Sequence, residues 1–229
     1  MYKLEMHLHV EGTSPCAKTD AKTIAELYKN NGYNGVVYTS HYNSFLMKYC
    51  NFANFGEYND NYLRHYEQLK EECSKVGVDV FFGAEFMPDE TSYYEETPFN
   101  AEFLIYGASP NEFMKRAESL LKKNVGYLHD YCKDNGYLLG QAHPFRESIT
   151  YRHPELIDCA EVINGNPRQH NHNEDALKYA EDNGLIFTAG SDFHEIVDCD
   201  AGVILENSVK TESQLVAELK KRKHKVFVV

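Results

Sequence analysis

The chain has 229 residues, of which 42% are hydrophobic and 25% are charged, and its formal net charge at pH 7 is −12. This composition argues against a disordered chain, and its acidic balance disfavours nucleic acid as a partner. No apolar run approaches the roughly 18 residues of a membrane span, and the first residues lack the apolar region of a signal peptide, which predicts a cytoplasmic protein without a membrane partner.

Short runs rich in β-branched and aromatic residues alternate with helical patterns along the chain. The expected strands are residues 2–10, 35–41, 78–86, 102–107, 137–143, 159–164 and 185–192. The expected helices between them are residues 19–31, 59–76, 110–135 and 173–183, several of which end at a glycine. The chain continues through residues 202–207, a helix from about Thr211 to Arg222 and a last strand over residues 225–229. This order predicts parallel strands covered by helices in one barrel-like α/β domain spanning residues 1–229.

One segment departs from this alternation. Residues 43–57 are rich in Asn, Phe and Tyr and are expected to form a long irregular loop. Such loops in compact domains often line binding sites, although an insertion without a role fits the pattern equally well.

Two histidines lie close together in the first expected strand. Successive side chains of a strand point to opposite faces, so His7 and His9 share one face, with their Cα atoms about 6 to 7 Å apart. Two imidazoles at this spacing can converge on one metal ion. The pair alone is weak evidence, because two hydrogen-bonded histidines on a half-buried strand would look the same.

Further ligand-type residues recur where the expected strands end. They are His41, Glu85, His143, Asp192 and His194. In parallel α/β barrels the carboxyl ends of the strands open onto one face, so these side chains are expected to meet His7 and His9 at one mouth. Mixed imidazole and carboxylate ligands suit zinc, iron or manganese, whereas all-oxygen sites suit magnesium or calcium.

With these residues in place, the chain resembles the PHP superfamily, named for its polymerase and histidinol phosphatase members. The resemblance runs nearly end to end and rests on HLH at 7–9, TSH at 39–41, GAE at 83–85, AHP at 142–144, NGN at 164–166 and GSDFH at 190–194. It implies a distorted seven-stranded (β/α) barrel, similar to a TIM barrel, with two or three divalent metals at its mouth. It also implies hydrolysis of phosphate esters.

The resemblance further implies how the ligands are shared among the metals. His7, His9, Glu85 and Asp192 would hold one ion, Glu85 would bridge to a second ion at His143, and His41 and His194 match the ligands of a third.

Two departures from the family pattern bear on the number of metals. Residues 11–20 lack the His or Asp that many members place after the HxH, which leaves Cys16 or Asp20 as substitutes. Residues 103–109 carry no His where many members supply another ligand to the second metal, which leaves Glu102 or water. Two metals are therefore expected, with a third left open.

Six cysteines lie at positions 16, 50, 73, 132, 159 and 199, without CxxC spacing. They are expected to be reduced and mostly buried. Cys16 and Cys199 follow the metal motifs closely enough to lie near the metals, but ordinary packing is the favoured interpretation.

The expected chemistry is attack on phosphorus by a hydroxide bridging two metals. Arg146 follows His143 closely and is expected to clamp a phosphate with its planar donor fork, a surface ion pair being the alternative, while Arg168 is a weaker candidate. His194 is expected either to bind metal or to protonate the leaving group.

The leading hypothesis for function is a phosphomonoesterase acting on a small phosphorylated metabolite. The alternatives are a nuclease or phosphodiesterase of the same superfamily, an amidohydrolase, and a metal-dependent binding module without activity. The sequence leaves the physiological substrate, the identity of the metal and the oligomeric state open.

Overall fold

The computed structural model describes residues 1–198 and 201–228, whose strands join in one ten-stranded sheet. The strands are β1 (Tyr2–Leu8), β2 (Gly35–Tyr38), β3 (His41–Tyr42), β4 (Asp79–Phe86), β5 (Phe103–Tyr106), β6 (Leu138–Gln141), β7 (Cys159–Asn164), β8 (Ile186–Gly190), β9 (Ala201–Leu205) and β10 (Lys225–Val228). The α-helices are α1 (Ala21–Asn30), α2 (Ser44–Tyr49), α3 (Phe55–Val76), α4 (Pro110–Leu121), α5 (Val125–Asp134), α6 (Asn173–Asp182) and α7 (Glu212–Lys220). Three short 3-10 helices are η1 (Asp89–Thr91), η2 (Pro154–Leu156) and η3 (Ile196–Asp198).

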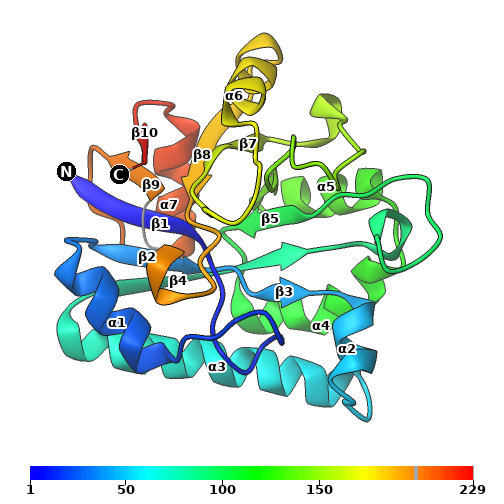
Figure 1. Cartoon of the computed structure of the whole chain (residues 1–229), viewed down its shortest axis with the longest axis horizontal. Coiled ribbons are helices and arrows are strands. Elements are labelled where there is room, and N and C mark those ends of the chain that lie inside the picture. The colour runs from blue at the N-terminus through cyan, green and yellow to red at the C-terminus, as the bar shows by residue number, and fades with distance from the viewer. Residues whose placement is uncertain (199–200, 229) are drawn as a thin grey trace.

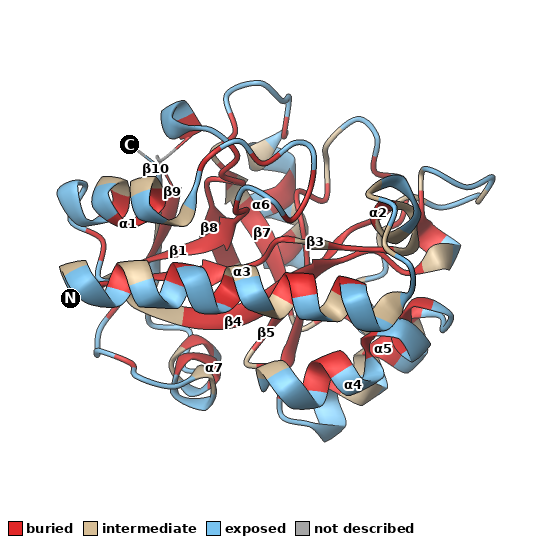
Figure 2. Ribbon diagram, turned by 90° about the horizontal axis from the view of Figure 1, so that it is seen from below, coloured by how far each residue is buried: buried red, intermediate tan, exposed pale blue. Residues whose placement is uncertain are grey.

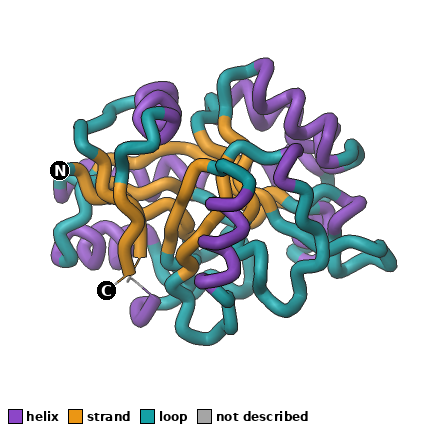
Figure 3. The backbone as a smooth tube through the Cα atoms, turned by 90° about the horizontal axis from the view of Figure 1, so that it is seen from above, coloured by secondary structure: helices purple, strands orange, loops and turns teal. Residues whose placement is uncertain are grey.

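The sheet curls into a nearly closed barrel with helices around it (Figures 1 and 3). Its strand order is β10-β9-β1-β2-β4-β5-β6-β7-β8, with β3 paired to β4. The run from β1 to β8 in this order comprises β1, β2, β4, β5, β6, β7 and β8, which are the seven strands of the barrel. A parallel bridge between Leu8 and Phe193 joins the two ends of this run. The expected seven-stranded, distorted α/β barrel is confirmed.

Not every strand runs in the expected direction. Strand β5 is antiparallel to both β4 and β6, and β9 is antiparallel to β1 and β10. The remaining pairs are parallel. The expectation of a wholly parallel sheet is therefore wrong at β5, whose amino-terminal end lies beside the carboxyl ends of its neighbours.

The helices bury one face against the sheet and expose the other (Figure 2). Four of them end near a glycine in the left-handed region, as the sequence predicts, at Gly32, Gly77, Gly136 and Gly184. The single helix expected over residues 110–135 is two helices, because Asn124 starts a new one by accepting a hydrogen bond from Tyr127 N.

Residues 43–57 are more regular than expected. Helix α2 begins after Asn43, whose side chain caps it through Leu46 N, and α3 begins after Asn54, which caps Glu57 N. Both asparagines act as N-caps, so the residues that suggested an irregular loop instead start helices. The loop prediction is wrong for most of this segment.

Buried tyrosines hold the segment around His41 in place. Tyr62 donates a hydrogen bond to Ser40 O at 2.7 Å, and Tyr58 donates one to His41 O at 3.2 Å. Tyr42 stacks between Tyr58 and Phe86, with ring centroids 4.8 and 5.7 Å away. The hydroxyls of Tyr58 and Tyr62 thus have partners, and they fix the backbone that carries His41.

The five cysteines within the described residues are free thiols. Cys73, Cys132 and Cys159 are buried as expected, whereas Cys16 is exposed; Cys199 lies outside the described residues. Within residues 1–198 and 201–228, no helix combines the length and the apolar character that crossing a bilayer requires.

Candidate metal centre

The end of β1 and the loop after β8 are joined by backbone hydrogen bonds. His9 N donates to Phe193 O at 3.0 Å, and Phe193 N donates to His7 O at 3.1 Å. Phe193 is buried, so this junction anchors His7 and His9 beside Asp192 although the two segments are far apart in sequence.

Four of the expected ligands form one buried group, comprising His7, His9, Glu85 and Asp192. His7 Nε2 lies 3.3 Å from Glu85 Oε1 and 3.5 Å from Asp192 Oδ1. His9 Nε2 lies 3.4 Å from Glu85 Oε2 and 3.2 Å from Asp192 Oδ1. Two ligands about 2.1 Å from a tetrahedral ion would lie roughly 3.4 Å apart, so the donor spacing fits a metal ion.

Several of these donor atoms are buried without an aligned hydrogen-bond partner. They are His7 Nε2, both ring nitrogens of His9, His41 Nδ1 and Glu85 Oε2. Two of them, His41 Nδ1 and Glu85 Oε2, lie 2.7 Å apart. Leaving a buried polar atom unpaired costs about 1–3 kcal/mol, so this group of atoms would be costly without a ligand. Metal coordination requires electron pairs that point into a common space. The residues present therefore fit a divalent metal.

A carboxylate that sequence reasoning missed orients two of the histidines. Glu161 Oε1 lies 2.9 Å from His7 Nδ1, and Glu161 Oε2 accepts a hydrogen bond from His143 N at 2.9 Å. The contact makes Nδ1 of His7 the protonated nitrogen and leaves Nε2 free for a metal. In the sequence, this role is indicated by the position of Glu161, which is the one charged residue in the strand CAEVIN.

The two asparagines of the NGN motif donate hydrogen bonds to Glu161 and Asp192. Asn164 Nδ2 donates to Glu161 Oε2 at 2.9 Å, and Asn166 Nδ2 donates to Asp192 O at 3.1 Å. The two asparagines therefore fix one orienting carboxylate and one candidate ligand.

His143 and Glu102 lie on the other side of Glu85. His143 Nε2 is 3.1 Å from Glu85 Oε1 and 3.6 Å from Glu102 Oε2, while Glu102 Oε1 is 3.4 Å from His41 Nδ1. The sequence left Glu102 or water for this position, and the structure places Glu102 there. The reason is the reversed direction of β5, which brings the residue before the strand to the mouth.

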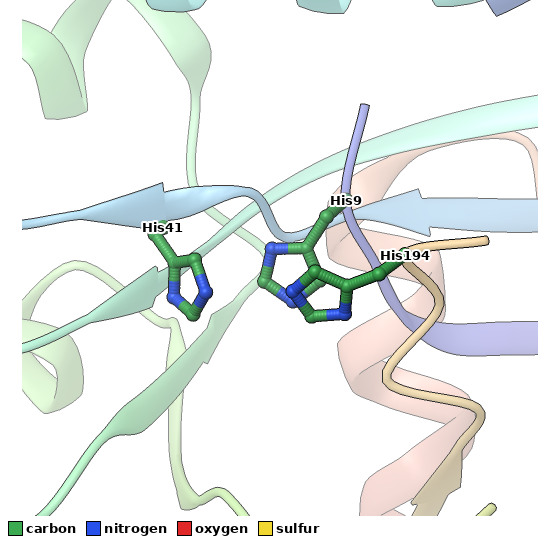
Figure 4. A group of neighbouring side chains, drawn as sticks. All are labelled: His9, His41 and His194. Carbon is green, nitrogen blue, oxygen red and sulfur yellow. The ribbon is translucent and has the colours of Figure 1, made fainter. Parts of the chain in front are cut away.

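Three histidines gather from three segments next to the four-residue group, as Figure 4 shows for His9, His41 and His194. The ring centroid of His9 lies 4.3 Å from that of His41 and 4.1 Å from that of His194. Burial, together with the nearby His194 and His41, lowers the pKa of His9 well below its usual value and keeps the ring neutral.

The two residues left open as substitutes after the HxH have different surroundings. Burial opposes ionisation of the Cys16 thiol, but His41 and His194 together outweigh it and lower the pKa of Cys16 to about 5. Asp20 instead caps α1, accepting hydrogen bonds from Lys22 N and Thr23 N at 3.0 Å. Only Cys16 is therefore placed at the site.

The carboxylates of the site stay charged despite their burial. Burial alone would raise the pKa of Glu85, but His7 and His41 lower it well below its usual range. Asp192 behaves alike: burial raises its pKa, while His7 and Arg146 lower it well below the ordinary value. Two anionic carboxylates at the centre favour binding of cations.

Arg146 is engaged with a candidate ligand. Its Nη2 donates to Asp192 Oδ2 at 2.6 Å, and its Nε donates to Asn171 Oδ1 at 3.0 Å. The side chain is 15% exposed, which excludes the alternative of a surface ion pair. Arg168 is more exposed and forms a two-pronged ion pair with Asp198, through oxygens 2.6 and 2.7 Å away.

Two candidate ligands adopt backbone conformations that side chains rarely take. His143 has a φ of 26° and Asp192 a φ of 50°. Left-handed backbone costs about 1–2 kcal/mol per residue, and strain of this kind concentrates at functional sites.

Two adjoining pockets open beside these residues. The first, of about 400 Å³, is polar and is lined by residues that include Lys18, Arg146, Arg168, Asp192 and His194. The second, of about 280 Å³, is lined by residues of the 43–57 segment together with Cys16, His41 and Tyr94. The candidate metal centre therefore lies at the base of the first pocket, which is the polar pocket. The second pocket, which is the apolar pocket, adjoins it and is lined partly by aromatic rings.

No protein-family model and no curated protein matches this sequence. Among solved structures, a two-domain protein from Bacteroides vulgatus that contains a predicted PHP-like metal-dependent phosphoesterase aligns with 99% of the chain at 14% identity and a TM-score of 0.70; this chain spans 64% of its length. A protein from Bifidobacterium adolescentis assigned as a metal-dependent phosphoesterase aligns over 96% of each chain at 14% identity and a TM-score of 0.50. An amidohydrolase from Chromobacterium violaceum aligns over 98% of this chain and 97% of its own at 11% identity and a TM-score of 0.57. At these identities the likeness establishes a shared TIM-barrel-like fold.

Proposed function

We propose that this chain is a PHP-type metal-dependent hydrolase that removes phosphate from a small phosphorylated metabolite. The observation that carries the proposal is the convergence of His7, His9, Glu85 and Asp192, with donor atoms 3.2–3.5 Å apart and several of them unpartnered. Two proteins of similar fold that are assigned as metal-dependent phosphoesterases support it.

The residues divide into two adjoining ligand groups that share Glu85. His7, His9, Glu85 and Asp192 would hold one divalent ion, and Glu85 would bridge to a second ion beside His143 and Glu102. Imidazole mixed with carboxylate suits zinc, iron or manganese. Such ions lower the pKa of water and neutralise the charge that develops on a phosphoryl group during hydrolysis.

The polar pocket supplies binding groups for the phosphate. Arg146 has five N–H donors, and only those on Nε and Nη2 are engaged with Asn171 and Asp192. Its remaining donors can bind an anionic ester, and Lys18 adds a positive charge in the same pocket, where Arg168 is already paired with Asp198. A pocket of about 400 Å³ is of the size that takes a small metabolite.

Two alternative activities differ in their substrates. A nuclease is disfavoured, because a net charge of −12 repels a polyanion. An amidohydrolase is a second candidate, since the Chromobacterium violaceum neighbour carries that activity on the same fold and a metal-activated water also attacks carbonyl carbon.

The test combines elemental analysis with a substrate screen. Purified protein should contain zinc, iron or manganese and should release phosphate from some monoesters, but cleave neither oligonucleotides nor amides. Asp192→Asn should lose metal and activity, while Asp182→Asn, an exposed ion-pair residue on α6, should keep both. Unchanged metal content and activity in Asp192→Asn would refute the assigned site.

A further inference from the structure

A second group of metal-binding side chains lies at the mouth of the pocket. The ligand nitrogens of His9, His41 and His194 lie within 4.8 Å of one another, and their rings come from the segment after β1, from β3 and from the loop after β8 (Figure 4). The family resemblance anticipates metal-binding histidines here but leaves this chain without the usual ligand between residues 10 and 20. The question is what completes the group.

The three histidines have ring nitrogens that can bind a metal ion. His9 is fully buried, and neither of its ring nitrogens has an aligned hydrogen-bond partner, while His41 Nδ1 lies 2.7 Å from Glu85 Oε2. His194 Nδ1 lies 2.8 Å from the carbonyl oxygen of Asp192. A carbonyl can only accept, so Nδ1 of His194 donates, and Nε2 is the nitrogen left for a metal.

Cys16 is carried to these histidines by a loop fastened over them. Lys18 N donates to His194 O at 2.9 Å, and Glu11 N donates to Thr19 O at 2.9 Å, which closes the loop. The Cys16 sulfur lies 3.0 Å from Ser14 Oγ. Cys16 lines the first pocket together with His41 and His194, and the second pocket together with His41.

We propose that Cys16 is a sulfur ligand of a divalent metal ion held with His41 and His194, beside the ion that His9 would help to hold. One thiolate and two imidazoles form a ligand set suited to zinc or cobalt and unsuited to magnesium. Binding converts the Cys16 thiol to a metal-bound thiolate and releases its proton to solvent. The inference rests on the proposed function only in that His9, whose neutral ring has one electron pair, is left to the adjoining ligand group.

The ligand can be read from the spectrum of the cobalt-substituted protein without any substrate. Metal-free protein titrated with Co²⁺ should develop the ultraviolet sulfur-to-cobalt charge-transfer band. Cys16→Ser should lose this band while retaining the visible cobalt bands of the nitrogen and oxygen ligands, and Cys50→Ser should keep both. Absence of the band in the wild type, or its persistence in Cys16→Ser, would overturn the proposal.

A measurement on the unaltered chain covers the case in which the variant does not fold. Cys16 is exposed, so iodoacetamide should modify it in the metal-free protein, and Zn²⁺ should suppress that modification when the modified peptide is quantified by mass spectrometry. Equal modification with and without Zn²⁺ would contradict sulfur ligation. Neither readout depends on turnover, so a charge-transfer band in a protein that hydrolyses no ester would leave Cys16 as a ligand and reject the phosphatase function.

Discussion

Glu161 Oε1 lies 2.9 Å from Nδ1 of His7, and both side chains are buried. The same carboxylate accepts the backbone N–H of His143 through its other oxygen. Glu161 is outside the set of candidate metal ligands, yet it orients two of them, His7 and His143. Its position makes the site sensitive to a change outside the ligand set.

Replacing Glu161 by Gln should weaken metal binding while the chain still folds. The amide lacks the charge that holds the His7 ring with its Nδ1 protonated, and loss of such a partner typically costs about 10- to 100-fold in metal affinity. Competition titration with a chromophoric chelator measures the affinity, and circular dichroism checks the fold. Glu155→Gln, which alters an exposed carboxylate bonded to His153, is the matched control. An unchanged affinity in Glu161→Gln would remove the orienting role.

Removing metal should lower the melting temperature. An ion present at 100 times its dissociation constant stabilises the folded chain by about 2.7 kcal/mol. For a chain of this length that corresponds to a shift of roughly 5–10 °C. Scanning calorimetry before and after chelation measures the shift. Asp192→Asn should melt at nearly the same temperature in both conditions, and an equal shift in that variant would place the stabilising ion elsewhere.

Gly190→Ala should damage both stability and metal binding. A Cβ at this position would lie 2.4 Å from His7 Cβ and 2.7 Å from His7 N, so β1 or β8 must move. Forced overpacking of this kind costs about 1–3 kcal/mol, and it falls on a candidate ligand. Gly126→Ala, which adds a methyl in ordinary contact near the start of α5, should be neutral or slightly stabilising. Denaturant unfolding measures the free energy of unfolding of both variants. Equal values would contradict the close packing at His7.

The strand-end residues could be predicted from the sequence because of how a barrel is built. His41, Glu85, His143, Asp192 and His194 follow strands that share one direction, so the carboxyl ends of those strands bring them together. The pattern needs only the order of the strands, which the alternation of apolar runs and helices reveals.

The two substitute ligands that the sequence left open, Glu102 and Cys16, are placed by information that the local pattern does not carry. Glu102 reaches the mouth because β5 is reversed, and the direction of a strand follows from its pairing with distant segments. Cys16 reaches the histidines through hydrogen bonds between its loop and the backbone of His194, nearly the whole chain away. Such contacts between distant segments are set by packing in the folded chain, and they produce no periodic pattern in the sequence.

Arg146→Lys should reduce catalytic efficiency and leave the metal content nearly unchanged. Lysine cannot contact Asp192, Asn171 and a phosphate at once, because it lacks the planar fork of arginine. Loss of one charge-assisted hydrogen bond costs about 1.5–3 kcal/mol, which is roughly 12- to 160-fold in kcat/KM. Steady-state kinetics with metal analysis separates the two effects. Full activity in this variant would exclude Arg146 from phosphate binding.

Phe45→Ala should change substrate preference rather than the chemistry. Phe45 stacks on Tyr94 with ring centroids 3.7 Å apart, and both rings line the apolar pocket next to His41. A phosphate ester with an aromatic leaving group can place its ring against them, and an aromatic contact contributes about 0.5–1.5 kcal/mol. The variant should therefore lose roughly 2- to 12-fold in kcat/KM for aryl phosphates, because each 1.4 kcal/mol is tenfold, and little for a small alkyl phosphate. Tyr127→Ala, which removes an exposed ring on α5, controls for the loss of an aromatic side chain. If both classes of ester lose the same factor, the apolar pocket does not hold the leaving group, and residues 43–57 act on the site only through the position of His41.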